Sequence, residues 1–214
     1  MKEINKGGAK PVRANKKSTV KPVATKKGGA VKKTEALTFH VVTLFPEALT
    51  SYLEASIIGR ALKEKKIKVA FYNPNHYAPR PKGKKKGEWF HRDMDGKPYG
   101  GGPGMVMTAE PVLKAVESAL KKIADRKSKI VHLKPLIYFF DASGDQFTNE
   151  TARAVVKKTH NIILICGRYE GIDARVQEIL KATKISVGPY ILTGGELPAL
   201  LVMDATARQV YDPA

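Results

Sequence analysis

Three glycine-bearing segments hold the residue types that could carry chemistry. The first is Pro98–Gly104 (PYGGGPG), where three successive glycines between prolines exclude a regular helix or strand. Such a backbone lets a ligand approach closely. The segment is no dinucleotide-binding fingerprint, because Met105 stands where a third glycine is needed, and no Gly-Lys-Ser/Thr follows to make a phosphate loop. A flexible hinge is the alternative interpretation.

The other two segments each join a predicted strand to a helix. In Cys166–Asp173 (CGRYEGID), two glycines flank an Arg, a Tyr and a Glu, a combination typical of a binding site. The alternative is that Glu170 and Asp173 only complement the positive end of the next helix. Ser186–Pro198 (SVGPYILTGGELP) is rich in backbone groups suited to hydrogen bonding with a purine-like edge and a ribose.

Strands and helices must alternate to position these segments. Leu136–Phe140 and Ile162–Cys166 are continuous apolar runs, as in buried parallel strands. Further strands are predicted at Leu37–Phe45, Ile67–Tyr72 and Ile185–Val187. Helices are predicted over Glu47–Lys65 with a break near Ser56–Gly59, from a Thr108 cap to about Asp125, from a Thr148 cap, through Ile172, Val176, Ile179 and Leu180, and over Glu196–Val210. Asn73–Gly104 reads as a long loop. The alternation predicts an α/β fold with a mostly parallel sheet flanked by helices, with ligands beyond the carboxyl ends of its strands.

Charge divides the 214 residues into a tail and a body. The chain has 38 Lys and Arg against 20 Asp and Glu, and residues 1–35 alone hold eleven basic and two acidic residues. Because no aromatic residue precedes Phe39, we expect residues 1–36 to be a disordered tail and 37–214 to be the folded domain. The tail either improves solubility only or neutralises phosphates as an RNA-binding arm.

Cysteine use and hydropathy exclude several classes of protein. The single cysteine, Cys166, excludes an intrachain disulfide framework and a multi-cysteine zinc site. The longest apolar run, Leu197–Met203, is far shorter than a membrane span needs. A cytoplasmic protein with a polyanionic partner fits these observations.

Together the segments resemble the bacterial tRNA (guanine-N1)-methyltransferases, the TrmD family of the trefoil-knotted SPOUT class. The resemblance spans roughly Thr38 to Val210. The residues that carry it are Thr43–Glu47, Ile58–Ala61, His91, Arg92, Pro98–Met105, Cys166–Asp173, Thr193–Ala199, Asp204 and Arg208. The C-terminal trefoil knot is implied by the resemblance alone, since ordinary topology rules discourage it.

The resemblance implies an activity, a donor and an assembly. Family members transfer a methyl group from S-adenosylmethionine to N1 of the guanine 3′ of the anticodon in tRNA, as homodimers whose tRNA site spans the interface. The implied donor-binding residues are Tyr138, Gly167, Arg168, Val187, Gly188, Pro189, Tyr190, Ile191, Leu192 and Gly195. The implied RNA-binding residues are His91, Arg92, Asp95, Tyr99, Gly100, Gly101 and Gly102. Tyr99 would stack on a base or simply pack.

Two residues are implied to take part in the chemistry. Glu170 matches a family Glu near a Mg2+ ion, and Arg208 matches the Arg that steadies the guanine and its developing charge. Without the resemblance, Arg208 reads as a cation that complements a helix C-terminus.

Several features depart from the family pattern. Family members continue beyond the matching helix into a linker, which carries the general-base Asp, and a helical C-terminal domain. This chain stops at Ala214, which fits either a naturally short member or a piece of a longer one. A piece would bind the donor but methylate poorly, whereas in a short member Asp95 or Asp212 would have to act as the base. The loop Phe139–Ser143, which normally touches the donor, is about one residue longer, and Pro189 replaces an Asp and removes a donor N–H.

These departures keep two other functions open. One is a catalytically weak RNA-binding module that keeps the fold but lacks the base. The other is a SPOUT enzyme that methylates a different RNA guanine.

Overall fold

The computed structural model describes residues 35–79, 83, 94–97, 104–125 and 133–211. The chain divides into two units, Met1–Lys33 and Thr34–Ala214, and the second is described here. Several predictions therefore lie outside the described residues. These are the tail up to residue 34, His91, Arg92, Tyr99, Gly100, Gly101, Gly102 and Asp212.

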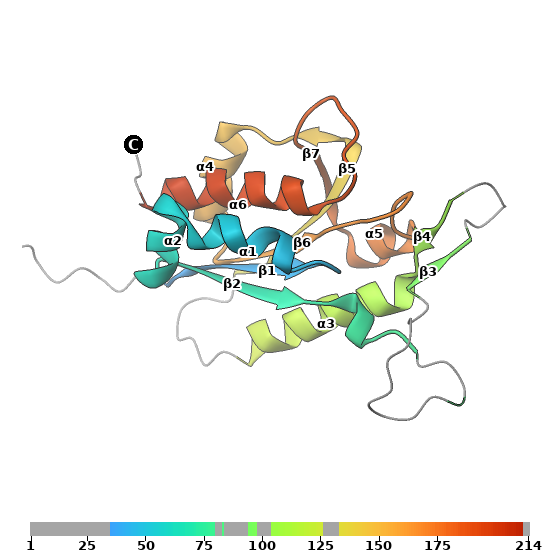
Figure 1. Cartoon of the computed structure of the whole chain (residues 1–214). Helices are drawn as coiled ribbons and strands as arrows, with labels where there is room; N and C mark the ends of the chain where they lie inside the picture. Colours follow the sequence, from blue (N-terminus) through green and yellow to red (C-terminus); the bar gives the residue numbers. More distant parts are fainter. Residues whose placement is uncertain (1–34, 80–82, 84–93, 98–103, 126–132, 212–214) are drawn as a thin grey trace, which may run out of the picture. The chain divides into compact units, whose positions relative to one another are not determined.

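The centre of the folded unit is a five-stranded sheet in which every strand pair is parallel. Its order is β2-β1-β6-β5-β7 (Figure 1). The strands are β1 (Leu37–Val42), β2 (Ile67–Tyr72), β5 (Leu136–Gln146), β6 (Asn161–Ile165) and β7 (Thr183–Ser186). All residues of β1 and β6 are buried, as the apolar runs predict for strands covered on both faces. The predicted mostly parallel α/β sheet is confirmed.

Helices cover both faces of this sheet, and side chains along β6 alternate between the two layers. Ile162 and Leu164 belong to the core beneath four helices, whereas Ile163 and Ile165 belong to the opposite core. The first layer holds α1 (Glu47–Glu54), α2 (Ser56–Lys63), α4 (Asn149–Lys158) and α6 (Glu196–Tyr211). The second layer holds α3 (Ala109–Ala124) and α5 (Arg175–Leu180). Figure 1 shows α6 and α1 on one side of the sheet and α3 on the other.

The break predicted in the first helical stretch is real and falls at Ala55, whose backbone is extended. Ser56 follows with φ 47°, and α2 begins there. Gly59 permits this tight junction, because a Cβ at that position would lie 2.3 Å from the Glu54 carbonyl oxygen. The break is thus a close backbone contact between α1 and α2.

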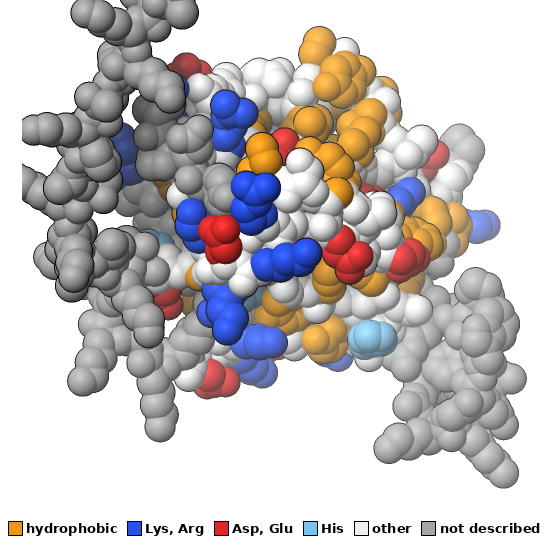
Figure 2. Space-filling view, turned by 60° about the vertical axis from the view of Figure 1, so that its left-hand side comes forward, with side chains coloured by type: hydrophobic (Ala, Val, Ile, Leu, Met, Phe, Trp, Pro, Cys, Tyr) orange, Lys and Arg blue, Asp and Glu red, His pale blue; other side chains and the backbone are white. Residues whose placement is uncertain are grey.

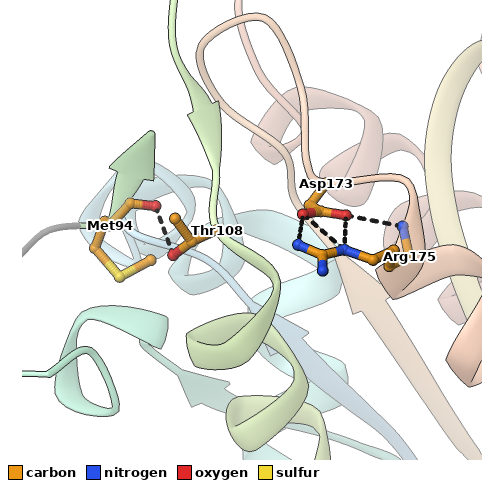
Figure 3. A network of polar contacts seen from close by, with 4 residues as sticks. All are labelled: Met94, Thr108, Asp173 and Arg175. Carbon is orange, nitrogen blue, oxygen red and sulfur yellow. Dashed lines mark hydrogen bonds and ion pairs between the residues drawn. The ribbon is translucent and has the colours of Figure 1, made fainter. Parts of the chain in front are cut away.

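Both predicted threonines occupy N-cap positions, but only one of them makes a side-chain capping hydrogen bond. Thr148 accepts a hydrogen bond from the Thr151 N–H, and Thr151 returns one, which makes a capping box at α4. Thr108 is the N-cap residue of α3, as predicted, but its hydroxyl makes no capping hydrogen bond to the helix. It donates instead to the Met94 carbonyl at 3.3 Å (Figure 3). Thr108 therefore ties α3 to the segment before it.

Other boundaries differ from the prediction where tertiary contacts intervene. The predicted loop Asn73–Gly104 contains a short 3-10 turn (Pro74–His76) and β3 (Asp95–Gly96), which pairs antiparallel with β4 (Val106–Met107). The helix predicted from Ile172 begins only at Arg175, and Ile179 is 63% exposed and not in the core. None of the described helices has both the length and the apolar character needed to cross a bilayer.

Strand β5 is longer than predicted and interrupted by a bulge. Its pairing with β7 shifts register between Phe140 and Asp145, so the intervening residues of β5 stay extended but are not paired with β7. Gly144 closes the bulge against β7, because a Cβ there would lie 2.6 Å from the Ile185 backbone nitrogen. The loop that the sequence makes one residue longer than the family pattern is this bulge.

Candidate cofactor pocket

A pocket of about 360 Å³ lies where β5, β6 and β7 approach their carboxyl ends. Its walls come from the β5 bulge, the loop after β6, and the loop that joins β7 to α6. They are formed by Phe140, Asp141, Ala142, Gly167–Gly171, Ile185–Gly188, Tyr190–Gly195 and Pro198. This is the edge at which open parallel sheets bind ligands.

Eight of the ten predicted donor-binding residues line this pocket. They are Gly167, Arg168, Val187, Gly188, Tyr190, Ile191, Leu192 and Gly195. Pro189 belongs to the same loop but is not part of the lining. Tyr138 lies in the core, edge-on to the Phe147 ring at 6.4 Å, and burial raises the pKa of its hydroxyl.

The site prediction named no residue of the β5 bulge, although Phe140, Asp141 and Ala142 form one wall. The signal in the sequence was the lengthened loop Phe139–Ser143, which the resemblance placed near the donor. Its role as a wall depends on the register shift against β7, and periodicity alone does not reveal such a shift.

Glycine allows two of the loops to meet backbone to backbone. The Gly195 N–H donates to the Gly167 carbonyl at 2.9 Å, and a Cβ on Gly195 would lie 2.5 Å from the Cys166 Cα. No side chain fits there. The loop after β6 and the start of α6 are therefore joined through main-chain atoms.

The first and second glycine-bearing segments also meet. The Glu170 N–H donates to the Met105 carbonyl at 3.0 Å, and a Cβ on Gly104 would lie 2.4 Å from the Glu170 Cγ. Tyr169 lies between Gly167 and Glu170, the two residues of this loop that make these backbone contacts. Its φ of 59° is a left-handed conformation that costs energy for a non-glycine residue. The described end of the Pro98–Gly104 segment thus holds a strained loop in the pocket wall.

Asp173 has the structural role that was the alternative to ligand binding, at the start of the next helix. Its carboxylate accepts from the Arg175 N–H at 3.0 Å and binds the Arg175 guanidinium (Figure 3). The hydrogen bond from Arg175 holds the pKa of Asp173 below its ordinary value of 3.8. Asp173 does not line the pocket; it stabilises the start of α5.

Three charged side chains line the pocket among the described residues: Arg168, Asp141 and Glu170. Asp141 accepts from the backbone and hydroxyl of Ser143 and forms an ion pair with Lys184 at 3.0 Å. The Ser143 hydrogen bonds, followed by Lys184, lower the pKa of this carboxyl. No group of three or more His, Cys, Asp or Glu side chains in the described ranges is arranged to hold a metal ion.

Arg208, predicted to act in catalysis, lies in a different place. It sits in the last turn of α6, beside a second pocket of about 480 Å³ that Tyr52, Ile57 and Asp204 also line. The cofactor pocket is at the first turn of the same helix. The 1.5 Å rise per residue separates Glu196 from Arg208 by about 18 Å, further than an arginine side chain extends.

The predicted RNA-binding residues are described only at Asp95. Its backbone lies in β3, paired with Met107, next to the strand that supports the pocket loop.

The fold and the pocket define an α/β protein with a pocket of small-ligand size at the carboxyl edge of a parallel sheet. The model of one family, the tRNA (Guanine-1)-methyltransferase TrmD, matches residues 37–212. The chain belongs to this family, as the glycine-bearing segments predicted.

Individual relatives agree with this assignment. A tRNA (guanine-N(1)-)-methyltransferase of Pseudoalteromonas atlantica is 43% identical over 80% of this chain and 58% of its own length. One from Moorella thermoacetica is 41% identical over 78% of this chain and 60% of its own length. The crystal structure of the tRNA (m1G37) methyltransferase from Aquifex aeolicus has a TM-score of 0.63 at 34% identity, covering 81% of this chain and 69% of that one. The chain thus spans about 60% of the length of these two curated relatives.

Proposed function

We propose that this protein transfers a methyl group from S-adenosylmethionine to N1 of the guanine 3′ of the anticodon in tRNA. The observation that carries the proposal is the pocket at the ends of β5, β6 and β7. Its walls contain eight of the residues implied for the donor. Membership of the family supports the fold, and the proposal adds the donor, the substrate and the position of the methyl group.

The lining suits a nucleoside-like donor. Glycines expose the backbone N–H and C=O groups of Gly167, Gly188 and Gly195, which can bond to the edges of an adenine and a ribose, while Val187, Ile191 and Leu192 offer apolar contacts. S-adenosylmethionine supplies a methyl group on a sulfonium already activated for displacement. The task of the chain is therefore to orient the donor and the guanine.

The guanine requires two further groups. Its N1 carries a proton at neutral pH, so a base must remove it, and negative charge then builds toward O6. Arg208 is the residue that we assign to stabilise this charge. Asp95 and Asp212 stay candidates for the base; the side chain of neither is among the described parts of the structure.

A second copy of the chain would bring Arg208 to the pocket, and we propose a homodimer for this reason. The distance along α6 prevents Arg208 from reaching the pocket of its own protomer. Large apolar side chains are also exposed on the helices nearby: Tyr52, Ile57, Leu197 and Leu201. Figure 2 shows hydrophobic side chains gathered in the upper part of one face, with Lys and Arg side chains mostly below them. Such a surface is typical of an interface.

The formal net charge of +18 supports a polyanionic substrate such as tRNA. We also propose that the reaction takes place in the cytoplasm. Mg2+ at Glu170 stays a prediction, because the described residues contain no group of three or more His, Cys, Asp or Glu side chains that could hold a metal ion. No step above depends on it.

The test is methyl transfer by the full chain to an unmodified tRNA transcript. We expect radiolabelled methyl groups to appear on the transcript, and to be lost when the guanine 3′ of the anticodon is replaced by adenine. Calorimetry with S-adenosylhomocysteine measures the pocket separately. Folded protein that binds no donor and transfers no methyl group would contradict the proposal.

A further inference from the structure

Glu196 lies beneath the pocket and joins three loops that are far apart in sequence. Its Oε1 accepts a hydrogen bond from the Thr43 hydroxyl at 2.7 Å, and its Oε2 lies 2.9 Å from the Nε of Arg168. Thr43 follows β1, Arg168 follows β6, and Glu196 opens α6. Glu196 is 4% exposed and Thr43 is fully buried, so water does not compete for these contacts.

The contact between Arg168 and Glu196 is ionic. The two atoms are close, but they lack the alignment of a hydrogen bond. Gly194 is what admits them, because a Cβ there would lie 2.6 Å from the Arg168 Nε and 2.7 Å from the Glu196 Oε2. A buried charge of this kind is tolerated only beside its partner.

A second contact fixes the plane of the Arg168 guanidinium. Its Cζ lies 4.7 Å from the centre of the Phe45 ring, a cation–π geometry. The Phe45 N–H in turn donates to the Thr43 hydroxyl at 3.0 Å. Thr43 therefore hydrogen-bonds to both residues that contact Arg168. One is Glu196, whose carboxylate faces the Arg168 Nε, and the other is Phe45, whose ring packs against the guanidinium.

Arg168 belongs to the pocket, whereas Glu196 and Thr43 do not. With its Nε toward Glu196, the guanidinium has its two terminal nitrogens to offer to a ligand, and two such nitrogens match a carboxylate. Arg168 is also the one cation among the described lining residues, beside the anions Asp141 and Glu170. The donor of the proposed reaction carries one anionic group, the carboxylate of its methionine part.

We propose that Glu196, held by Thr43, is a positioning residue that aims Arg168 at the donor carboxylate. This inference rests on the proposed function, because it assumes S-adenosylmethionine as the ligand. Glu196 and Thr43 act through Arg168 and touch no ligand themselves. Their substitution should therefore weaken binding of a donor that has the carboxylate more than binding of a donor that lacks it.

The experiment compares S-adenosylmethionine with its decarboxylated analogue, which differs by the carboxylate alone. Calorimetry on the full chain gives the dissociation constant of each. We expect Glu196→Gln to weaken S-adenosylmethionine about tenfold, the size of one charged hydrogen bond, and to change the analogue less than twofold. Glu178→Gln, which removes an exposed carboxylate of α5, is the matched control and should change neither.

A second pair of variants keeps the test decisive if Glu196→Gln does not fold. Thr43→Val removes the hydroxyl at nearly constant volume, and Thr43→Ser keeps it. We expect the valine variant to bind S-adenosylmethionine more weakly than the unmodified chain but to bind the decarboxylated analogue equally well. The serine variant should bind both ligands as the unmodified chain does.

Three outcomes overturn the inference. Equal weakening of both ligands would mean that the three residues only shape the pocket, and unchanged affinities would mean that Arg168 needs no such support. A loss of tRNA affinity with donor affinity intact would assign Arg168 to an RNA phosphate. If the unmodified chain binds neither ligand, the proposed function itself fails, which is a separate result.

Discussion

The Thr43 hydroxyl donates to the Glu196 carboxylate at 2.7 Å, although 153 residues separate the two in the chain. The bond links the end of β1 to the start of α6 beneath the pocket, where both residues are shielded from water. Because a buried carboxylate left without a donor keeps its desolvation penalty, Thr43→Val should lower the free energy of unfolding by about 2 kcal/mol. Urea denaturation measures this loss. Thr50→Val, at an exposed hydroxyl, should change stability little, and equal losses in the two variants would contradict the argument.

Gly195→Ala should reduce donor affinity more than tenfold. The added methyl group would lie 2.5 Å from the Cys166 Cα, so the loop after β6 and the start of α6 would have to separate. Titration with S-adenosylhomocysteine gives the affinity. In Gly96→Ala the new methyl group meets only ordinary contacts, with the nearest atom at 3.6 Å, so that variant should bind as the unmodified chain does. Unchanged binding in both would show that the two loops need not touch.

Arg208→Ala should lower kcat for methyl transfer by about 10²–10³ and leave donor affinity unchanged, because Arg208 is far from the pocket of its own protomer. Single-turnover kinetics and donor titration separate the two quantities. Arg153→Ala, an arginine of α4 outside both pockets, is the control.

Mixing the two impaired variants, at a donor concentration too low to saturate Gly195→Ala, tests whether Arg208 acts across a dimer. A mixed dimer of Arg208→Ala and Gly195→Ala protomers would keep one site with neither change, so co-refolded protein should regain roughly a quarter of the activity. No recovery, with mixed dimers demonstrated by tag capture, would place Arg208 and the pocket in the same protomer.

Deletion of residues 1–35 should weaken tRNA binding and make its salt dependence shallower. The segment carries eleven basic residues and two acidic ones, and each phosphate contact releases a counterion. Filter binding over a range of salt concentrations gives the slope, and donor affinity should stay constant. An unchanged slope would leave the tail with no role in RNA binding.

Asp173→Asn should lower stability at neutral pH and lose its effect in acid. The hydrogen bond from Arg175 depresses the pKa of Asp173 below 3.8, so the contribution is present above that pH and disappears as the pH falls through the folded-state value. Because the Arg175 partner is largely exposed, we expect only about 1 kcal/mol at pH 7. Urea denaturation at several pH values measures the difference in free energy of unfolding between the variant and the unmodified chain, with Asp145→Asn as the control. A stability difference that did not shrink as the pH was lowered would contradict the assignment.

Much of the local structure was predictable because its causes are local. The strand Ile67–Tyr72 was predicted to the residue, and the Thr148 cap and the break before Gly59 followed from residue types within a few positions. Thr108 also stands at the predicted N-cap position, but its hydroxyl bonds to the Met94 carbonyl, outside its own helix, and not to the first turn of α3. Ile179 failed as a core residue because its helix starts late and is short.

By itself the sequence determined which segments bend and what they contain: glycines that expose backbone, an Arg and a Glu after β6, and a family pattern that names a donor. Only the tertiary structure decided which of these meet. It brought Gly195 against Gly167 and Thr43 under Glu196, turned the lengthened loop after Tyr138 into a wall, and placed Arg208 at the far end of α6. Helical and extended periodicity arise from neighbours in the chain, whereas a pocket depends on strand order and register, which are fixed by burying both faces of one sheet at once.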